Sequence, residues 1–367
     1  MLTIPRDLLP ADGRFGSGPS KIPAGRLDAL AATEASLMGT SHRQPPVKGL
    51  VRRVVDGLTT LFGLPEGYQV AIGNGGSAAF WDLATFTLIE RRSQHAVFGE
   101  FGQKFAGAAR KAPWLEEPSV LTAEPGGRVL PSAEDGVDAY AWTHNETSTG
   151  VWAPVVRPAA DALSIVDATS AAGGLTVDIA EADVYYFAPQ KSFASDGGLW
   201  LAILSPAAIE RAERIAGSGR HIPAFFDLLG AVKSTRLDQT FNTPAVATLF
   251  LMAEQLDWML GHGGLAGMAA RTAASAEALY GWAEKSSYAA PFVPDPEHRS
   301  AVVGTIELDP AIDKGALTDT LRDNGIVDLD SYRGVGANQL RVAMYPAVDA
   351  ADVEALTACI DWVVERL

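Results

Sequence analysis

Short apolar runs alternate with amphipathic segments between about residue 26 and residue 260. The short runs have the length of buried strands, and segments between them, such as 77–91 and 103–111, have helical spacing. Strands are expected at 68–72, 96–98, 139–143, 163–166, 183–187 and 199–204. This alternation predicts an α/β fold, in which a mostly parallel sheet is flanked by helices.

A different pattern begins after a long apolar helix that is expected at 245–260. Thr243 is its predicted N-cap and Pro244 its first residue, and a glycine-rich turn ends it. Helix, strand, helix, strand and helix are then expected at 268–285, 301–308, 314–324, 340–344 and 351–367. We therefore predict three parts, namely an N-terminal arm (1–25), a large domain (26–260) and a smaller α+β C-terminal domain (261–367).

The composition is that of a folded protein with an excess of acidic residues. Of the 367 residues, 47% are hydrophobic and 20% charged, and the formal net charge is −15. Such a charge argues against binding to nucleic acids or acidic membranes. The single cysteine, Cys359, excludes an intrachain disulfide, and the six histidines show no metal-ligand spacing. No signal peptide or membrane-spanning run is recognised, so we expect a cytoplasmic protein without a metal.

A lysine and an aspartate stand at the ends of two neighbouring apolar runs. Lys191 follows the run at 183–187, and Asp167 ends the run LSIVD at 163–167. Catalytic groups of such sheets lie at the carboxyl ends of the strands. The pair is typical of sites for pyridoxal 5′-phosphate (PLP), where the lysine binds the cofactor covalently and the aspartate keeps its pyridine nitrogen protonated. The sequence therefore predicts a PLP site at Lys191 and Asp167.

Three further segments follow predicted strands, and each has two interpretations. The turn GNGGS at 73–77 joins glycines to a helix N-terminus, which suits an anion, although an ordinary strand–helix turn is the simpler interpretation. Phe101 has the place of an aromatic that stacks on a flat ring, or of one that fills a loop. Thr147 has the place of a donor to the phenolic oxygen of the cofactor, or of a turn residue.

Four cationic residues are candidates for substrate binding: His42, Arg43, Arg333 and Arg341. Arginine suits bidentate contacts with a carboxylate or a phosphate, although a single arginine is more often a surface charge. A substrate that carries both a carboxylate and a phosphate would need several such residues. In a chain with a net charge of −15, a cluster of cations is therefore informative.

The chain resembles the phosphoserine aminotransferases, which are class-V aminotransferases of PLP fold type I. The likeness runs through nearly the whole chain and rests on short motifs in family order. They are FGSGPS at 15–20, SHR at 41–43, NET at 145–147, VD at 166–167, QK at 190–191, NTP at 242–244 and LR at 340–341. The resemblance implies a large PLP-binding domain, a smaller C-terminal domain and a homodimer with shared active sites.

The resemblance also implies a role for each matching residue. Lys191 is the Schiff-base lysine, Asp167 is the partner of the pyridine nitrogen, and Phe101 replaces the usual stacking tryptophan. The cofactor phosphate is assigned to Gly76, Ser77 and Gln190 with Asn242 and Thr243 of the second subunit, and substrate to His42, Arg43, Arg333 and Arg341. Ser77 stands where many members have arginine, and Tyr332 where many have histidine. These departures suggest a divergent branch such as that of the actinobacteria.

The implied reaction moves the amino group of L-glutamate to 3-phosphohydroxypyruvate, giving O-phospho-L-serine and 2-oxoglutarate in serine biosynthesis. Some members also use a related phosphorylated 2-oxo acid in vitamin B6 synthesis, and the sequence does not decide this point.

The closest alternative is a serine- or alanine–glyoxylate type of class-V aminotransferase, whose small substrates would leave His42 and Arg43 without a purpose. A cysteine desulfurase needs a nucleophilic cysteine on a mobile loop, whereas Cys359 lies in a predicted helix. The intact Lys191 and Asp167 argue against a non-catalytic relic of the fold.

Overall fold

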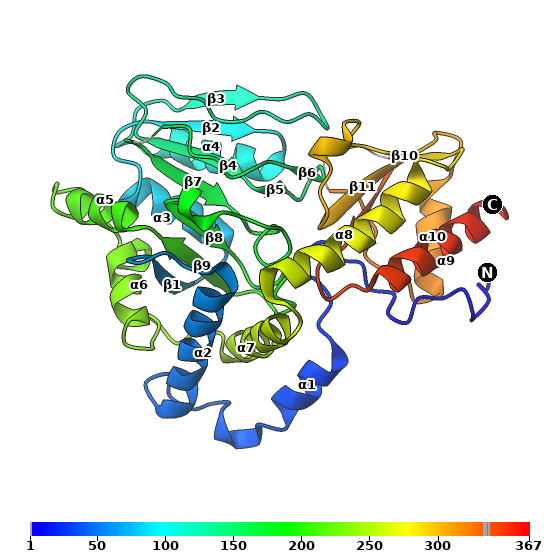
Figure 1. Ribbon diagram of the computed structural model, residues 1–367, viewed down its shortest axis with the longest axis horizontal. Helices are drawn as coiled ribbons and strands as arrows, with labels where there is room; N and C mark the ends of the chain where they lie inside the picture. The colour runs from blue at the N-terminus through cyan, green and yellow to red at the C-terminus, as the bar shows by residue number, and fades with distance from the viewer. Residues whose placement is uncertain (1, 160, 333–335, 337) are drawn as a thin grey trace.

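A seven-stranded sheet forms the centre of the larger lobe in the computed structural model, which describes residues 2–159, 161–332, 336 and 338–367 (Figure 1). Across the sheet the strands are β1 (Gln69–Asn74), β9 (Leu199–Leu204), β8 (Val184–Phe187), β7 (Leu163–Asp167), β4 (Ala139–Thr143), β2 (Ser93–Val97) and β3 (Ser119–Thr122). β9 runs antiparallel to both of its neighbours, whereas the pairs from β8 to β3 are parallel. The predicted mostly parallel sheet is thus confirmed, and the carboxyl ends of β7 and β8 lie at the same edge.

Helices cover both faces of this sheet, because the strands carry apolar side chains on both sides. In β8, Tyr185 and Phe187 belong to one core, and Val184 and Tyr186 belong to the other. The first core is covered by α2 (Pro45–Phe62) and α7 (Val246–Gly261). The second is covered by α3 (Ser77–Thr87), α4 (Glu100–Lys111), α5 (Pro206–Ala216) and α6 (Leu228–Thr235).

A smaller lobe contains an antiparallel sheet of β10 (Ala289–Pro291), β11 (Val303–Leu308) and β12 (Gln339–Ala343). Its helices are α8 (Gly264–Ala283), α9 (Lys314–Asp323) and α10 (Ala350–Val364). The hydrophobic core of this smaller lobe also contains Ile4 and Phe15 from the N-terminal arm. The backbone amide of Ala343 in β12 donates a hydrogen bond to the carbonyl of Phe15 at 3.0 Å. Both ends of the chain therefore help to build this lobe, on whose outer side they lie (Figure 1).

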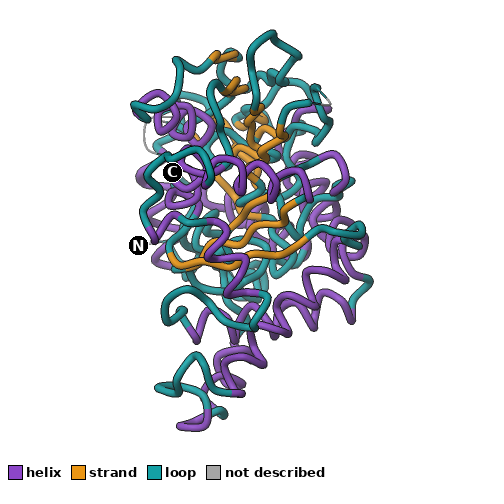
Figure 2. Tube along the Cα trace, turned by 90° about the vertical axis from the view of Figure 1, so that its left-hand side faces the viewer, coloured by secondary structure: helices purple, strands orange, loops and turns teal. Residues whose placement is uncertain are grey.

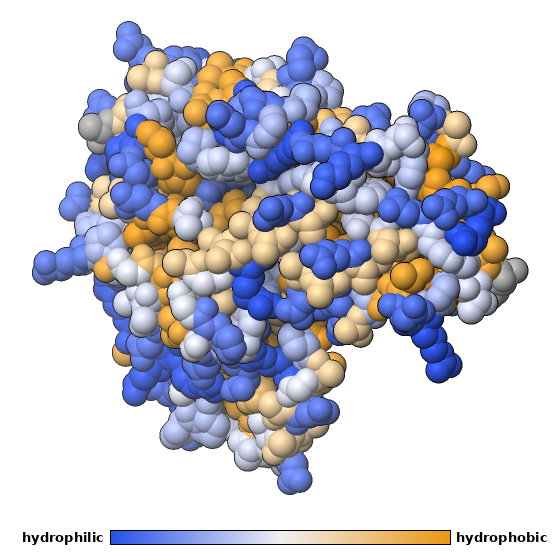
Figure 3. Space-filling model, turned by 45° about the vertical axis from the view of Figure 1, so that its right-hand side comes forward, coloured by the Kyte–Doolittle hydropathy of each residue, from blue (hydrophilic) through white to orange (hydrophobic). Residues whose placement is uncertain are grey.

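One helical segment lies away from both sheets. α1 (Ala24–Ala31) and η1 (Glu34–Ser36) form the lower end of the molecule in two perpendicular views (Figures 1 and 2). α1 has no buried residue, and Leu27 and Met38 are each 47% exposed. Large apolar side chains of this segment are therefore left facing solvent. On the face in Figure 3, hydrophobic areas are interspersed with hydrophilic residues.

Most predicted elements are present, with ends shifted by a few residues. α7 requires a correction, because it begins at Val246 with Ala245 as its N-cap, so Thr243 and Pro244 precede it. β2 begins at Ser93, ahead of the predicted strand at 96–98. The prediction missed its first residues because they are polar, although they are buried. The Ser93 hydroxyl and His95 share a hydrogen bond of 2.9 Å, which a hydrophobic pattern does not reveal.

The remaining elements are short. They are β5 (Asn145–Glu146), β6 (Val151–Trp152), η2 (Ile179–Glu181), η3 (Ala224–Phe226) and η4 (Pro296–His298). Within the described part of the chain, no helix is long and apolar enough to cross a membrane. In that same part, no group of three or more His, Cys, Asp or Glu side chains is placed to hold a metal ion.

Candidate active site

The neighbouring strands β7 and β8 bring Asp167 and Lys191 to one cavity. Asp167 is the last residue of β7, and Lys191 follows β8 after a short turn. Both line a cavity of about 340 Å³. The cavity is also lined by five further residues that the sequence predicted: Gly76, Ser77, Phe101, Thr147 and Gln190. Side chains from five separate segments of the chain therefore converge where the strand-end rule expects them.

Lys191 is buried in surroundings that disfavour its charged form. Its side chain is reached by little solvent, and Nζ donates a hydrogen bond to the carbonyl of Ser17. Burial, together with the positive charge of Arg341, lowers the pKa of Lys191 to about 7 against the opposing effects of Asp167 and Glu146. Near neutral pH a large fraction of the amine is therefore unprotonated and able to act as a nucleophile or a base.

The N-terminal arm passes directly over this lysine. A Cβ atom on Gly18 would lie 2.0 Å from Lys191 Nζ, and the φ angle of Gly18 is +154°. Any side chain at this position would therefore displace the lysine. The glycine of the FGSGPS motif is explained by this close approach.

The carboxylate of Asp167 is held by donors on both oxygens. Oδ1 accepts from the amide of Thr169 at 3.0 Å and from its hydroxyl at 2.5 Å. Oδ2 accepts from the hydroxyl of Tyr186 at 2.9 Å and from Nε1 of Trp81 at 3.2 Å. The sequence analysis missed these three partners. A signal was present for Trp81, which lies one helical turn after Ser77 on the face that lines the cavity.

The part of the cavity wall at the start of α3 suits an anion. Gly76 is the N-cap of α3 and Ser77 its first residue, so the unsatisfied amides at the start of this helix lie at the cavity wall. The Ser77 hydroxyl contacts the hydroxyl of Thr169 at 2.5 Å. Oε1 of Gln190 is buried without a hydrogen-bond partner. A phosphate group would meet the unsatisfied amides of the helix end here.

Phe101 is positioned by a buried glutamate. Glu146 accepts hydrogen bonds from the amides of Phe101 and Gly102, each at 3.1 Å, and from the Ser148 hydroxyl at 2.6 Å. Burial raises the pKa of Glu146, although these hydrogen bonds counteract the shift. The glutamate fixes the first turn of α4 and thereby holds the Phe101 ring at the cavity. Sequence reasoning placed Glu146 in a motif but gave it no role.

The Thr147 segment links the two lobes. The Thr147 hydroxyl donates to Ser170 Oγ at 2.8 Å, and its carbonyl accepts from Arg341 Nη1 at 3.3 Å. Arg341 lies in β12 and lines a second cavity of about 550 Å³, which shares Gly18 with the first. Its Nε is buried without a partner, and burial lowers the pKa of its guanidinium. The predicted Arg333 lies outside the described residues.

The other predicted residues form a separate group. His42 Nδ1 and the Thr243 hydroxyl are 3.2 Å apart, and the side-chain amide of Asn74 donates to the Thr243 carbonyl at 2.8 Å. Arg43 and Asn242 are exposed. None of the four predicted residues in this group (His42, Arg43, Asn242 and Thr243) lines the cavity around Lys191. Within one chain, the structure therefore does not bring these residues to the lysine.

Comparison with known proteins gives the family. The class-V aminotransferase family matches residues 132–356. A phosphoserine aminotransferase from Nocardioides sp. is 66% identical over all of this chain and 99% of its own length. The chain belongs to the phosphoserine aminotransferase family. Like the other members of this family, it is a PLP-dependent aminotransferase.

Solved structures agree with this assignment at the level of the fold. A phosphoserine aminotransferase from Cytophaga hutchinsonii covers 96% of this chain and 99% of its own, with a TM-score of 0.88 and 24% identity. A PLP-bound phosphoserine aminotransferase from Trichomonas vaginalis covers 95% of this chain and 99% of its own, with a TM-score of 0.80 and 18% identity. At these identities the likeness shows the PLP fold type I alone.

The residues around Lys191 fit PLP. A lysine can bind the aldehyde, a fixed carboxylate can pair with the ring nitrogen, an aromatic ring can stack, and a helix N-terminus can bind the phosphate. Thr143 Oγ1, Asn145 Oδ1 and Gln190 Oε1 are buried hydrogen-bonding atoms without partners. All three residues line this cavity. Their unused capacity is what a polar ligand would satisfy.

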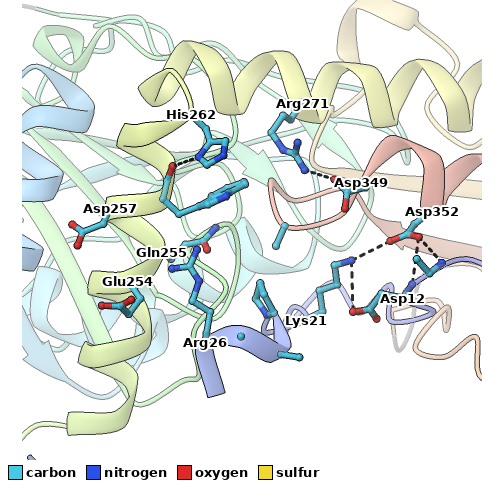
Figure 4. A pocket seen from close by; sticks show the side chains of 16 residues that line it. Asp12, Lys21, Arg26, Glu254, Gln255, Asp257, His262, Arg271, Asp349 and Asp352 are labelled. Atoms are coloured by element: carbon cyan, nitrogen blue, oxygen red, sulfur yellow. Dashed lines mark hydrogen bonds and ion pairs between the residues drawn. The ribbon is translucent and has the colours of Figure 1, made fainter. Parts of the chain in front are cut away.

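A larger cavity, of about 860 Å³, lies between the N-terminal arm, α1, α7 and the start of α10 (Figure 4). Most of its charged side chains are paired. Lys21 contacts Asp352 at 3.2 Å, and Arg271 contacts Asp349. None of the site residues predicted from the sequence lines it. Size alone therefore does not identify the catalytic cavity.

Proposed function

We propose that this enzyme transfers the amino group of L-glutamate to 3-phosphohydroxypyruvate, giving O-phospho-L-serine and 2-oxoglutarate. The observation that carries the proposal is the meeting of Lys191 and Asp167 in one cavity, with Arg341 at its border. The relative from Nocardioides sp., which is 66% identical and named a phosphoserine aminotransferase, supports the same substrates.

When bound, PLP supplies an aldehyde that takes up the amino group and a ring that withdraws electrons from the substrate carbon. Lys191 first holds the cofactor and, once released, carries a proton on Nζ to and from the substrate. A lysine with the ordinary pKa of about 10.4 would be too basic for this task. Its lowered pKa of about 7 allows Nζ to accept and return a proton near neutral pH.

The other residues of this cavity bind the cofactor and fix its orientation. Asp167, fixed by Thr169, Tyr186 and Trp81, pairs with the protonated ring nitrogen. Phe101 covers one face of the ring. The Thr147 hydroxyl, which donates to Ser170 Oγ in this structure, would turn its hydrogen to the phenolic oxygen of the ring when the cofactor is bound. The phosphate of the cofactor is bound by Gly76, Ser77 and Gln190, which line the end of the cavity at the α3 N-terminus.

Substrate recognition is assigned to the four cationic residues predicted from the sequence, of which Arg341 lines the second cavity. Arg341 binds the α-carboxylate that glutamate and the acceptor share, because its buried guanidinium has hydrogen-bonding capacity left. His42, Arg43 and Arg333 bind the distal phosphate of the acceptor or the side-chain carboxylate of glutamate. A glyoxylate-type aminotransferase would have no use for a distal cationic group.

The active enzyme in this proposal is a cytoplasmic homodimer with shared active sites. His42, Arg43, Asn242 and Thr243 of each chain serve the cavity of the partner chain, since they do not line their own. Large apolar side chains near them support an interface. On the α1–η1 segment and on the loop before α7, Leu27, Met38, Leu237 and Phe241 are each at least 45% exposed.

A cysteine desulfurase does not fit the described geometry. Cys359 is fully buried in α10, and its thiol donates to the carbonyl of Leu8 at 3.2 Å. Burial raises the pKa of this thiol to about 11, so the nucleophilic thiolate is scarce at neutral pH.

Kinetics on matched acceptors test the proposal. With glutamate as donor, we expect much higher kcat/KM for 3-phosphohydroxypyruvate than for hydroxypyruvate or glyoxylate. The phosphorylated 2-oxo acid of vitamin B6 synthesis is assayed in parallel to establish the acceptor range. Equal use of hydroxypyruvate or glyoxylate would reject the phosphoserine assignment and favour the glyoxylate type. A spectrum of the pure protein, titrated with glutamate and then with the acceptor, checks cofactor turnover independently.

A further inference from the structure

A hydrogen bond joins the two lobes beside the substrate cavity. Lys104 of α4 donates from Nζ to the hydroxyl of Tyr332 at 2.7 Å, across 228 positions of sequence. Tyr332 lies in the segment before β12 and lines the 550 Å³ cavity together with Arg341. None of the roles given above uses Lys104.

The Tyr332 ring lies between the cofactor side and the substrate side of the site. Its centroid is 5.4 Å from that of Phe101, with an edge-on geometry, and 5.4 Å from Cζ of Arg341. Nζ of Lys104 is 5.3 Å from the same ring. Tyr332 is therefore held by an aromatic contact and by two cations, and it cannot move without disturbing them.

The direction of the hydrogen bond leaves the phenolic hydrogen available. A lysine ammonium has donors only, so the Tyr332 oxygen must accept, and its own O–H points elsewhere. Among the described residues, no acceptor for this hydrogen is found. A phenol that accepts from an ammonium becomes a stronger donor, because chains of hydrogen bonds polarise one another.

Lys104 adds positive charge beside the described lining of this cavity. Its described charged residues are Asp328, Asp330 and Arg341, which makes two carboxylates against one guanidinium. A phosphate ester carries nearly two negative charges at neutral pH and would be repelled by such a lining. Lys104 supplies a cation next to this cavity from the other lobe.

We infer that Tyr332 and Lys104 form part of the binding site for the distal phosphate, with the Tyr332 hydroxyl donating to a phosphate oxygen and Lys104 polarising that hydroxyl. The inference rests on the proposed function and names residues that determine its specificity. Tyr332 is the residue in contact with substrate, and Lys104 acts through it.

Glu100 provides a test in which the expected effect on phosphate binding has the opposite sign. Its carboxylate lies 3.3 Å from Lys104 Nζ, one turn earlier on α4. It draws part of the ammonium charge away from Tyr332. Removal of Glu100 should therefore strengthen phosphate binding, whereas removal of Lys104 should weaken it. A purely structural role for the contact would not give effects of opposite sign.

The experiment compares kcat/KM for 3-phosphohydroxypyruvate and hydroxypyruvate in matched variants of the PLP-loaded enzyme. In Tyr332→Phe and Lys104→Met, we expect the preference for the phosphorylated acceptor to fall about tenfold, mainly through KM. Lys104→Arg should retain most of it, and Glu100→Gln should increase it. The double variant should lose no more than the larger single loss, because both residues act through one contact.

Lys111→Met is the matched control, because Lys111 is an exposed lysine at the end of the same helix. It should leave the preference unchanged. If Tyr332→Phe and Lys104→Met keep the wild-type preference, the inference is wrong while the proposed function stands. If the wild type itself shows no preference for the phosphorylated acceptor, the proposed function has failed first.

Discussion

A buried amine between an aspartate and an arginine behaves unlike a lysine in water. Nζ of Lys191 loses hydration, and the Arg341 charge opposes protonation, so its pKa falls to about 7. The neutral amine reacts with the cofactor aldehyde, and its fraction rises as the pH passes upward through the pKa. We expect covalent uptake of PLP by the apoprotein to level off near pH 8. A lysine in water, with a pKa of about 10.4, would still be gaining reactivity at pH 10.

Borohydride reduction followed by peptide mapping at each pH measures this uptake and should label Lys191. In Arg341→Met, one cause of the lowered pKa is removed, so the profile should move to higher pH. Label on another lysine would contradict the assignment, as would a profile that keeps rising to pH 10. Lys191→Ala should bind PLP without a covalent bond and show no transamination.

The second prediction for a single residue concerns Asp167. In Asp167→Ala the ring nitrogen loses its anionic partner, and turnover should fall by on the order of 10²–10³. The fold should survive, because Thr169, Tyr186 and Trp81 line or adjoin a cavity that water can enter. Circular dichroism and steady-state kinetics check the two parts. Asp135→Ala, at an exposed site, is the control, and near-normal turnover of Asp167→Ala would overturn the pairing argument.

Sequence reasoning found the residues that perform chemistry more readily than those that hold them. Lys191 and Asp167 could be recognised because each follows an apolar run, and the strand-end rule then joins them. Tyr186 reads only as one aromatic residue of a buried strand. Its contact with Asp167 depends on the register of β7 and β8, which pairs these two residues directly. Such information exists only once the sheet is assembled.

At the scale of elements, the first turn of α4 depends on one side chain outside the helix. Glu146→Ala would leave the amides of Phe101 and Gly102 and the Ser148 hydroxyl without their acceptor. We expect a loss of about 1–3 kcal/mol in the free energy of unfolding. Weaker PLP binding should accompany it, because Phe101 is no longer held. Chemical denaturation and a PLP titration measure the two effects.

Glu213→Ala, on the exposed side of α5, serves as the control for loss of an acid and should change little. Equal effects of the two variants would remove the proposed role of Glu146. The conservative Glu146→Gln should keep one acceptor oxygen and lose less than Glu146→Ala.

Elements were predictable where hydrophobicity and period agree. β4 and β9 have the predicted bounds, because their residues are buried throughout and all are apolar except Thr143. β3 was missed, since as an edge strand it is only half-buried and lacks a continuous apolar run. The place of β9 between β1 and β8 was also beyond the pattern, because strand order is decided by long-range pairing.

For the whole molecule, shared active sites predict complementation between inactive chains. Lys191→Ala lacks the lysine, and Thr243→Asp should lose PLP because a carboxylate repels the phosphate. In a hybrid dimer, one site has both wild-type residues. After mixing and reassociation, activity should therefore approach about a quarter of the wild-type value. Recovery is measured after separation of dimers by size.

Three controls provide the comparison. Each parent mixed with itself should stay inactive, and a mixture kept without subunit exchange should also stay inactive. An active monomer in sedimentation would contradict the proposal. Exchanged hybrids that form in quantity without any activity would contradict it equally.

The arm that crosses Lys191 has a consequence for synthesis on the ribosome. Phe15 lies in a core with residues of β12 and α10, and the Ser17 carbonyl accepts from Tyr345, 328 positions later. The arm must therefore wait for residues translated 328 positions later before it finds its place. The seven-stranded sheet can form before β12 and Tyr345 have been made, whereas the arm can close over the lysine only after them. A nascent chain stalled before β12 should then be compact in its centre, loose at its beginning and without a finished catalytic cavity.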